Sequence, residues 1–391
     1  MTTYADTRSA ADAAVLRSEL VEDEVHTRTG CRLHTSYLPA RFRWYARTQP
    51  GVFARVKRWI SIGEYLEEQL FGETAVTYSV ASWTGLLHRR ALTWDAAMLA
   101  ALPVAASHLS PLTDVDRPQQ GLRAAYARRW PMLHDIPWFP AVGDGAAANV
   151  GSGCVTPRRV ALTVGTTSAL RVIVDGAPAE VPPGLWCYRV DRRRSLLGGA
   201  LSEGGSVYAW MRDTLSLDDP AALEETLAAM TPDAHGLTVL PFWAGERSPG
   251  WAGDARAVIQ GLSLATQPVE ILQAGLEAVA YRLGLVFDRL RTEIPDDVRV
   301  VVSGRALPAS PTWLQMVADV LDQPLVISQV KETTARGAAL LALEALGAVT
   351  TLASLPHFDG KIVSPNAERH EVYRRAMARQ QALYGRLIGS V

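Results

Sequence analysis

Asp144 is the residue whose type and neighbours most directly offer chemistry, because it stands between Gly143 and Gly145 in "WFPAVGDGAAANVG" (residues 138–151). A carboxylate held in a tight turn can accept the proton of an alcohol or water as a general base. An aspartate in an Asp-Gly turn also commonly bonds its own backbone, which is a structural role. The stretch taken alone leaves both interpretations open.

Glycine-containing turns follow strand-like runs at four places in the rest of the chain, at residues 143–145, 165–168, 198–205 and 303–306. Such turns let backbone N–H groups approach the phosphates of a nucleotide, since no side chain stands in the way. They also occur as plain connectors between strands and helices. The "GTTS" of residues 165–168, between two β-rich runs, predicts a hairpin.

Composition excludes several other classes of function. The chain has 391 residues, 48% of them hydrophobic and 20% charged, which predicts two domains with sizeable cores. A net charge of −1 gives no electrostatic reason to expect nucleic acid or a membrane surface as partner. The three cysteines are too scattered for a disulfide framework, and the histidines show no metal-binding spacing. With no leader-like or membrane-spanning segment, we expect a cytoplasmic protein without a dedicated metal site.

The elements that must position these turns differ between the two parts of the chain. Residues 9–25 predict one amphipathic helix, and the first third is mostly helical with no parallel sheet of its own. After residue 138, strands alternate with helices, including a long helix over 268–292, which indicates an α/β layer.

Six motifs in this order resemble the FGGY carbohydrate kinases, and most of all their gluconokinase-like branch. They are "GDGAAANVGSG", "TVGTTSALRV", "GGALSEGGSVYAWMRD", "LPFWAGERSPGW", "SGRAL" with "SPTWLQMVADVL", and "ETTARGAALLALEALG". The resemblance implies an α/β fold of the actin-like ATPase (ribonuclease-H-like) kind. Its domains would span residues 1–155 on the sugar side and 156–391 on the nucleotide side.

The resemblance also implies the chemistry. ATP with Mg²⁺ would phosphorylate a hydroxyl of a sugar or sugar acid such as gluconate, with Asp144 as general base. The implied nucleotide-binding residues are Gly165, Thr166 and Thr167 of the hairpin, Gly204 and Gly205 before a helix, and Gly304 and Arg305. Simple turns are the alternative for each. No nucleic acid or membrane partner is implied.

On the sugar side, "YADTR" resembles a family segment that lines the substrate pocket, so Tyr4, Asp6 and Arg8 are candidate sugar contacts. For Asp6 and Arg8 the alternative is a structural role at the start of a surface helix, where an aspartate is favourable. Tyr78 matches a position that touches polyol in some members, and a core tyrosine is the alternative. In "AGERSPGW" we expect Glu246 to take part in an internal ion pair with Arg247.

Two departures from the family pattern bear on activity. The opening D-x-G-T-T hairpin of the family is absent, which leads us to expect a first domain truncated at its N-terminus and weak or no ATP turnover. A regulatory protein that binds sugar, and an enzyme completed by a second chain, are the alternatives to an incomplete kinase. A homodimer would cover the apolar face that a missing sheet exposes. The second departure is Arg305, which stands where the family has glycine, and we expect it to crowd the nucleotide or strain the turn. The alternative is that the side chain swings outward and stacks on adenine or contacts a phosphate.

Overall fold

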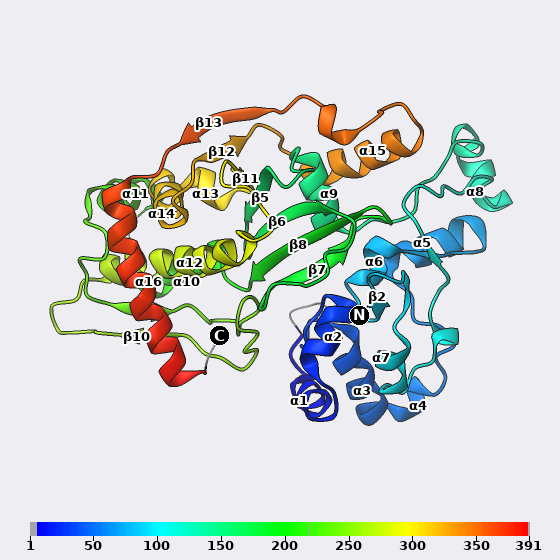
Figure 1. Cartoon of the computed structure of the whole chain (residues 1–391), viewed down its shortest axis with the longest axis horizontal. Helices are drawn as coiled ribbons and strands as arrows, with labels where there is room; N and C mark the ends of the chain where they lie inside the picture. Colours follow the sequence, from blue (N-terminus) through cyan, green and yellow to red (C-terminus); the bar gives the residue numbers. More distant parts are fainter. Residues whose placement is uncertain (1–5, 218, 390–391) are drawn as a thin grey trace.

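A mixed seven-stranded sheet forms the centre of the molecule in the computed structural model, which describes residues 6–217 and 219–389 (Figure 1). The strand order is β13-β12-β11-β5-β6-β8-β7, with β12, β11 and β5 parallel and the other neighbours antiparallel. The strands are β5 (Arg159–Val164), β6 (Ser168–Asp175), β7 (Trp186–Arg189), β8 (Arg194–Leu201), β11 (Arg299–Ser303), β12 (Leu325–Ser328) and β13 (Asp359–Val363). The predicted α/β layer is confirmed.

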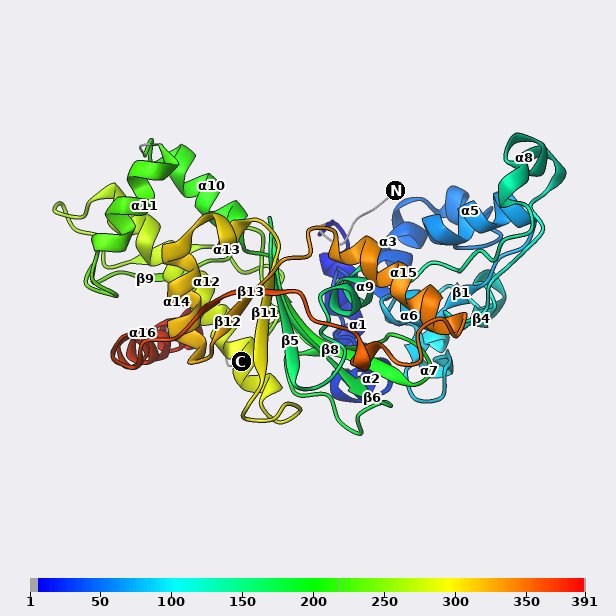
Figure 2. The same cartoon turned by 90° about the horizontal axis from the view of Figure 1, so that it is seen from above.

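Helices cover both faces of this sheet (Figure 2). One face carries α10 (Gly205–Thr214), α12 (Pro268–Leu290) and α14 (Pro311–Leu321), and the other carries α9 (Asp144–Gly151) and α15 (Thr333–Ala345). Successive side chains of β6 point to opposite faces of the sheet, so the strand contributes to both cores. Leu170 packs in the cluster that includes α12, and Ile173 packs with α9. The predicted helix over 268–292 is confirmed as α12.

Most of the remaining elements of the second half surround the α12 face. They are α11 (Pro220–Ala229), the β9 (Thr238–Leu240) and β10 (Val258–Gln260) pair, α13 (Ala306–Ala309) and α16 (Ala367–Leu387). The short η3 (Leu352–Ser354) packs on the other face, where Leu352 joins the cluster that includes α9 and α15. Side-chain caps fix helix starts on the α12 side: Asp219 accepts from the Ala221 amide at 2.8 Å, Ser310 from the Trp313 amide at 3.2 Å, and Asn366 from the Arg369 amide at 3.0 Å.

The first third of the chain is mostly helical, as predicted, and lies on the α9 side of the sheet (Figures 1 and 2). Its helices are α1 (Ala10–Glu19), α2 (Glu22–Thr29), α3 (Leu38–Thr48), α4 (Pro50–Phe53), α5 (Ile62–Phe71), α6 (Tyr78–Ser82), α7 (Ala96–Ala100), η1 (Ala106–His108), α8 (Ala124–Arg129) and η2 (Pro131–Leu133). Two-residue strands pair as β1 (Val76–Thr77) with β4 (Leu112–Thr113), and β2 (Leu87–His88) with β3 (Thr93–Trp94).

The single helix predicted over residues 9–25 is wrong, because α1 ends at Glu19 and α2 begins at Glu22. Leu20 is extended, with φ −122° and ψ 146°. The acidic run Glu22-Asp23-Glu24 then starts a new helix, where negative charge is stabilised by the helix N-terminus.

Helices α9 and α15 cross with their backbones in direct contact. A Cβ at Gly151 would lie 1.7 Å from the carbonyl oxygen of Thr333, and one at Gly337 would lie 1.8 Å from the carbonyl oxygen of Ala147. Only glycine fits at such an approach, so the pair of glycines fixes where the two helices cross. No described helix has the length and apolar character needed to traverse a bilayer.

Candidate active site

Asp144 is the first residue of α9 and is exposed to solvent, with Gly143 at the N-cap. Two hydrogen bonds from the α6 segment fix this turn. The Gly143 amide donates to the Ser79 hydroxyl at 3.0 Å, and the Thr77 hydroxyl donates to the carbonyl oxygen of Ala141 at 2.7 Å. The carboxylate is therefore held by a rigid support and remains accessible to a substrate.

Trp83 lies directly on the same turn. A Cβ at Gly143 would come 2.2 Å from Cζ2 of the indole, so any larger residue would push the turn and the ring apart. The glycine before Asp144 is thus required by close packing, since its φ of −58° suits any residue.

The predicted hairpin at residues 165–168 is confirmed as the turn between the antiparallel strands β5 and β6. The Gly165 amide donates to the Thr167 carbonyl at 2.9 Å, and Thr166 is exposed at the tip. The Gly205 amide, in the first turn of α10, donates to the Gly165 carbonyl at 2.7 Å. The hairpin is therefore joined to the helix that follows β8.

The other glycine turns lie against this hairpin. A Cβ at Gly204 would be 2.7 Å from the carbonyl carbon of Thr167, and one at Gly205 would be 3.2 Å from Cβ of Ala306. Gly304 has φ +87°, and its Cβ would lie 2.4 Å from the Val164 carbonyl oxygen. The structure brings together the three turns that we predicted to hold a nucleotide.

Arg305 does not strain its turn, so that part of our expectation is wrong. Its backbone is ordinary, with φ −102° and ψ −27°, because Gly304 takes the left-handed conformation that the turn needs. The Arg305 side chain is exposed.

A chain of polar side chains joins the Asp144 turn to the nucleotide turns. Nη1 of Arg171 would be 3.1 Å from a Cβ at Gly145, and its Nη2 donates to the Thr163 hydroxyl at 2.7 Å. Thr163 shares a 2.9 Å hydrogen bond with the hydroxyl of Ser303, the residue before the Gly304 turn. Burial lowers the pKa of Arg171, while the negative charge of Asp144 acts in the opposite direction.

Two of the three predicted sugar-side residues near the N-terminus lie in the described part of the chain, and they bond to each other. Tyr4 falls outside the described residues. The guanidinium of Arg8 donates to both carboxylate oxygens of Asp6, at 2.6 to 3.1 Å, and lies 4.5 Å from the ring centre of Trp44. This hydrogen bonding lowers the pKa of Asp6 to about 2. With 61% of its side chain exposed, Arg8 is a surface residue whose charge is already paired.

The structure also describes three residues that could surround a metal ion, namely Asp233, His235 and Glu277. The Leu237 amide donates to Nδ1 of His235 at 2.9 Å, so the ring hydrogen is on Nε2 and is donated to Glu277 at 3.0 Å. Hydrogen bonding therefore accounts for this group.

Sequence profiles of one family match most of the chain. The FGGY family of carbohydrate kinases is matched by its N-terminal domain over residues 1–151 and by its C-terminal domain over residues 160–346. The chain belongs to this family. The FGGY kinase is therefore a phosphotransferase with an alcohol group as acceptor, and its fold is the two-domain, actin-like ATPase fold. The N-terminal profile matches from residue 1, so it does not support our expectation of a truncated first domain.

Individual relatives agree with the family. The gluconokinase of Bacillus subtilis (strain 168) is 28% identical over 388 residues, which cover 96% of this chain and 76% of the relative. A glycerol kinase of Halorhodospira halophila is 30% identical over 357 residues, 88% of this chain and 69% of the relative. This FGGY kinase is thus gluconokinase-like in sequence.

Solved structures show the same fold. Ligand-bound xylulose kinase from Lactobacillus acidophilus has a TM-score of 0.91 at 25% identity and covers 99% of this chain and 80% of its own. Gluconate kinase from the same organism has a TM-score of 0.90 at 25% identity, with 98% and 79% covered.

Tyr78 of the FGGY kinase is half-buried at the start of α6, beside the two residues that hold the Asp144 turn. It packs partly against Val76, Ala81 and Leu87. The pKa of Arg192 is raised, mainly by its hydrogen bond to Asp114 and slightly by Tyr78. Tyr78 therefore combines a core contact with a position next to the candidate site.

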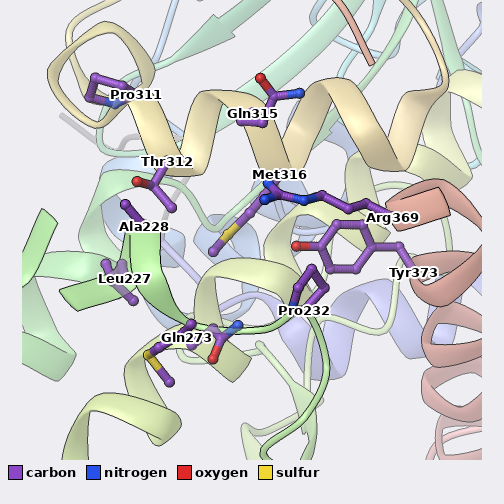
Figure 3. Close-up of a pocket in the computed structure, with 11 residues that line it drawn as sticks. Leu227, Ala228, Pro232, Gln273, Pro311, Thr312, Gln315, Met316, Arg369 and Tyr373 are labelled. Atoms are coloured by element: carbon purple, nitrogen blue, oxygen red, sulfur yellow. The ribbon is translucent and has the colours of Figure 1, made fainter. Parts of the chain in front are cut away.

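Two of the cavities in the described part of the kinase lie outside the predicted residues and bear on the site in different ways. One of about 780 Å³, in the first third, has a largely apolar lining that includes Phe42, Trp59 and Trp83, with Arg41 and Glu64 among the polar residues. Figure 3 shows the other, about 230 Å³, between α11, α14 and α16, where Arg369 and Tyr373 are among the lining residues. Only the first is connected to the Asp144 turn, through Trp83.

Sequence reasoning missed the supporting residues of the site in this kinase. Trp83 and Ser79 hold the Asp144 turn, and Arg171 and Thr163 join it to the hairpin. Glu246 is buried and forms an internal ion pair with Arg282 of α12, a partner that the sequence did not suggest. The one local signal was Arg171 itself, an arginine within the apolar run "ALRVIVD".

Proposed function

We propose that this kinase transfers the terminal phosphoryl group of ATP to a hydroxyl of a sugar or sugar acid, with Asp144 as the general base. The observation that carries the proposal is the polar chain from Gly145 through Arg171 and Thr163 to Ser303. It joins the turn that presents Asp144 to the turns that predict nucleotide binding.

Asp144 suits the role of base because its carboxylate is exposed while the backbone beneath it is fixed by Ser79 and Trp83. The acceptor hydroxyl would give its proton to Asp144 as its oxygen bonds to the γ-phosphorus. The bond between that phosphorus and the β,γ-bridging oxygen then breaks, and ADP leaves with the bond's electrons.

The nucleotide turns could lie close to a phosphate chain, because Gly204 and Gly205 carry no side chain and Thr166 is exposed at the hairpin tip. The amides of Thr166 and Thr167 and the Thr166 hydroxyl would hold the phosphates, since the amides of Gly165 and Gly205 are already donated to the hairpin carbonyls. Gly304 and Arg305 would border the adenine. Mg²⁺ neutralises charge on the phosphates, and the threonine hydroxyls and phosphate oxygens are the hard donors it takes.

The acceptor side would be formed by the first third of the chain. Tyr78 is retained as a sugar contact because the α6 segment that carries it is bonded to the Asp144 turn. The pair of Asp6 and Arg8 would support the pocket as a neutral unit. Gluconate is the first acceptor to test, since gluconokinases are among the relatives.

A coupled assay of ADP release with gluconate, xylulose and glycerol tests the proposal. Asp144→Asn should lower kcat by about 10² to 10⁴ while ATP still binds, because only the proton acceptor is lost. Asp135→Asn, an exposed aspartate in the α8 region, is the matched control. Full turnover by Asp144→Asn would remove Asp144 from the base role, and sugar binding without any ADP release by the unmodified chain would favour a regulatory protein.

A further inference from the structure

The guanidinium of Arg171 forms no ion pair with a carboxylate in the described part of the chain, although the negative charge of Asp144 acts on it and raises its pKa against the effect of burial. Its one hydrogen bond is donated by Nη2 to the Thr163 hydroxyl, and its Nε is buried without a partner. A guanidinium enclosed in protein is costly unless an anion neutralises it. The remaining donors of Arg171 therefore give this position the capacity to bind an anionic ligand beside Asp144.

The free side of this guanidinium faces the Asp144 turn. A Cβ added at Gly145, the residue after Asp144, would lie 3.1 Å from Nη1 of Arg171. No side chain caps the start of α9, so its first amides add positive partial charge at the same place. Arg171 is half-buried, so part of the residue is accessible to a ligand.

The face of the sheet on which Arg171 lies indicates whether an anion bound there would belong to the acceptor or to the nucleotide. Arg171 alternates with Leu170 and Val172, which pack in the α12 cluster, and it shares its face with Ile173, which packs with α9. The hairpin is joined to α10 on the opposite face, through the amide of Gly205. An anion bound by Arg171 would therefore belong to the acceptor.

We infer that Arg171 is the specificity-determining residue of the acceptor site and binds the carboxylate of a sugar acid whose hydroxyl lies at Asp144. This deepens the proposed function and rests on it for the position of the hydroxyl. Nη1 and the second hydrogen of Nη2 are left for two parallel bonds to a carboxylate, the geometry in which arginine is strongest. Arg8 lacks this capacity, because its guanidinium is already bonded to Asp6.

Binding without ATP tests the inference separately from catalysis. Isothermal titration would compare gluconate with glucitol, the neutral polyol of equal carbon number, on the unmodified protein, on Arg171→Gln and on the control Arg158→Gln. Arg158 is 66% exposed in a surface pair with Asp297. The ratio of gluconate to glucitol affinity should fall about thirtyfold or more in Arg171→Gln, since a desolvated charge partner is lost, and stay constant in the control.

An unchanged ratio in Arg171→Gln, or no gluconate binding by the unmodified protein, would overturn the inference. If Arg171→Gln fails to fold, Arg171→Lys replaces it and should still lower the ratio by about tenfold, because lysine cannot form the paired bonds. A third outcome would also overturn the inference. If Arg171→Gln lowers ADP release equally with gluconate and with glucitol, while the ratio of their affinities stays unchanged, Arg171 acts on the transferred phosphoryl group and not on the acceptor carboxylate. A fall in the binding ratio without any ADP release would support Arg171 while contradicting the kinase proposal.

Discussion

Trp83 is packed against Gly143 so closely that a Cβ there would lie 2.2 Å from the indole Cζ2. The ring belongs to the first third of the chain, and the glycine is the N-cap of the helix that begins with Asp144. The contact therefore positions the proposed base relative to the acceptor side, and it gives the first prediction.

Gly143→Ala should reduce kcat by about a hundredfold, because displacing a reacting group by about 1 Å has that effect. Overpacking should also lower the free energy of unfolding by about 1–3 kcal/mol. Steady-state ADP release and urea unfolding measure the two effects. Gly51→Ala is the control, since no atom lies within 4 Å of its added Cβ. A Gly143→Ala protein with normal kcat would show that the turn tolerates movement.

Gly204→Ala should raise the KM for ATP by about tenfold or more, because the new Cβ would be 2.7 Å from the Thr167 carbonyl carbon and would displace the hairpin amides. Gly385→Ala in α16, where a Cβ meets nothing within 4 Å, is the matched control. Titration of ATP at saturating acceptor gives the KM. Equal KM values in the two variants would argue against the hairpin as the phosphate site.

Glu203 should make stability depend on pH. It is 2% exposed beneath the hairpin, where its carbonyl accepts from the Ser168 hydroxyl, and burial raises the pKa of its carboxyl to about 8. The ordinary pKa of a glutamate carboxyl, which applies in the unfolded state, is 4.5. At pH values between 4.5 and about 8, folded Glu203 therefore keeps a proton that the unfolded chain has released. Stability should therefore fall as pH rises through this window.

Glu203→Gln should remove that dependence, which urea midpoints at pH 5 to 8.5 would measure for both proteins. Burial lowers the pKa of His26 to about 4 and of His34 to about 3, so these residues destabilise the fold as pH falls below 6.5. Both proteins share that effect, and the difference between them isolates Glu203. If the urea midpoints of the unmodified protein and of Glu203→Gln changed with pH in the same way, Glu203 would not contribute to the pH dependence.

Arg282→Met should destabilise the fold by about 3–5 kcal/mol, because it leaves the buried carboxylate of Glu246 without its cation. Tyr384 and the Gly250 amide would still donate to Glu246, at 2.6 and 3.1 Å. Urea unfolding measures the loss, with Arg158→Gln as the exposed control. A loss equal to that of the control would mean that the two neutral donors suffice.

The sequence predicted the turns of the site because their signals are local. "GTTS" between two β-rich runs defines a hairpin, and glycines before an apolar helical pattern mark the start of α10. The contacts that join the turns were not predictable in this way. Thr163 and Ser303 are 140 residues apart and meet only because β5 and β11 pair in parallel.

The break between α1 and α2 was missed for a related reason. The apolar spacing continues through Leu20, but the Glu22 carboxylate accepts from the amide of Leu33 at 2.7 Å, a contact that starts a separate helix. The first third has one short parallel pair, β1 with β4, where the sequence predicted no parallel sheet, and the inference of a truncated domain from that pattern is not supported.

The crossing at Gly151 and Gly337 has a consequence for how Asp144 is held. Asp144 lies on α9, and α9 is locked backbone to backbone onto α15 over the same sheet that bears the hairpin. The carboxylate is therefore fixed from two directions, because its helix is fixed to α15 over the sheet and its turn is fixed to Ser79 and Trp83 of the first third. Any shift of the first third relative to the sheet would act directly on the turn that carries Asp144.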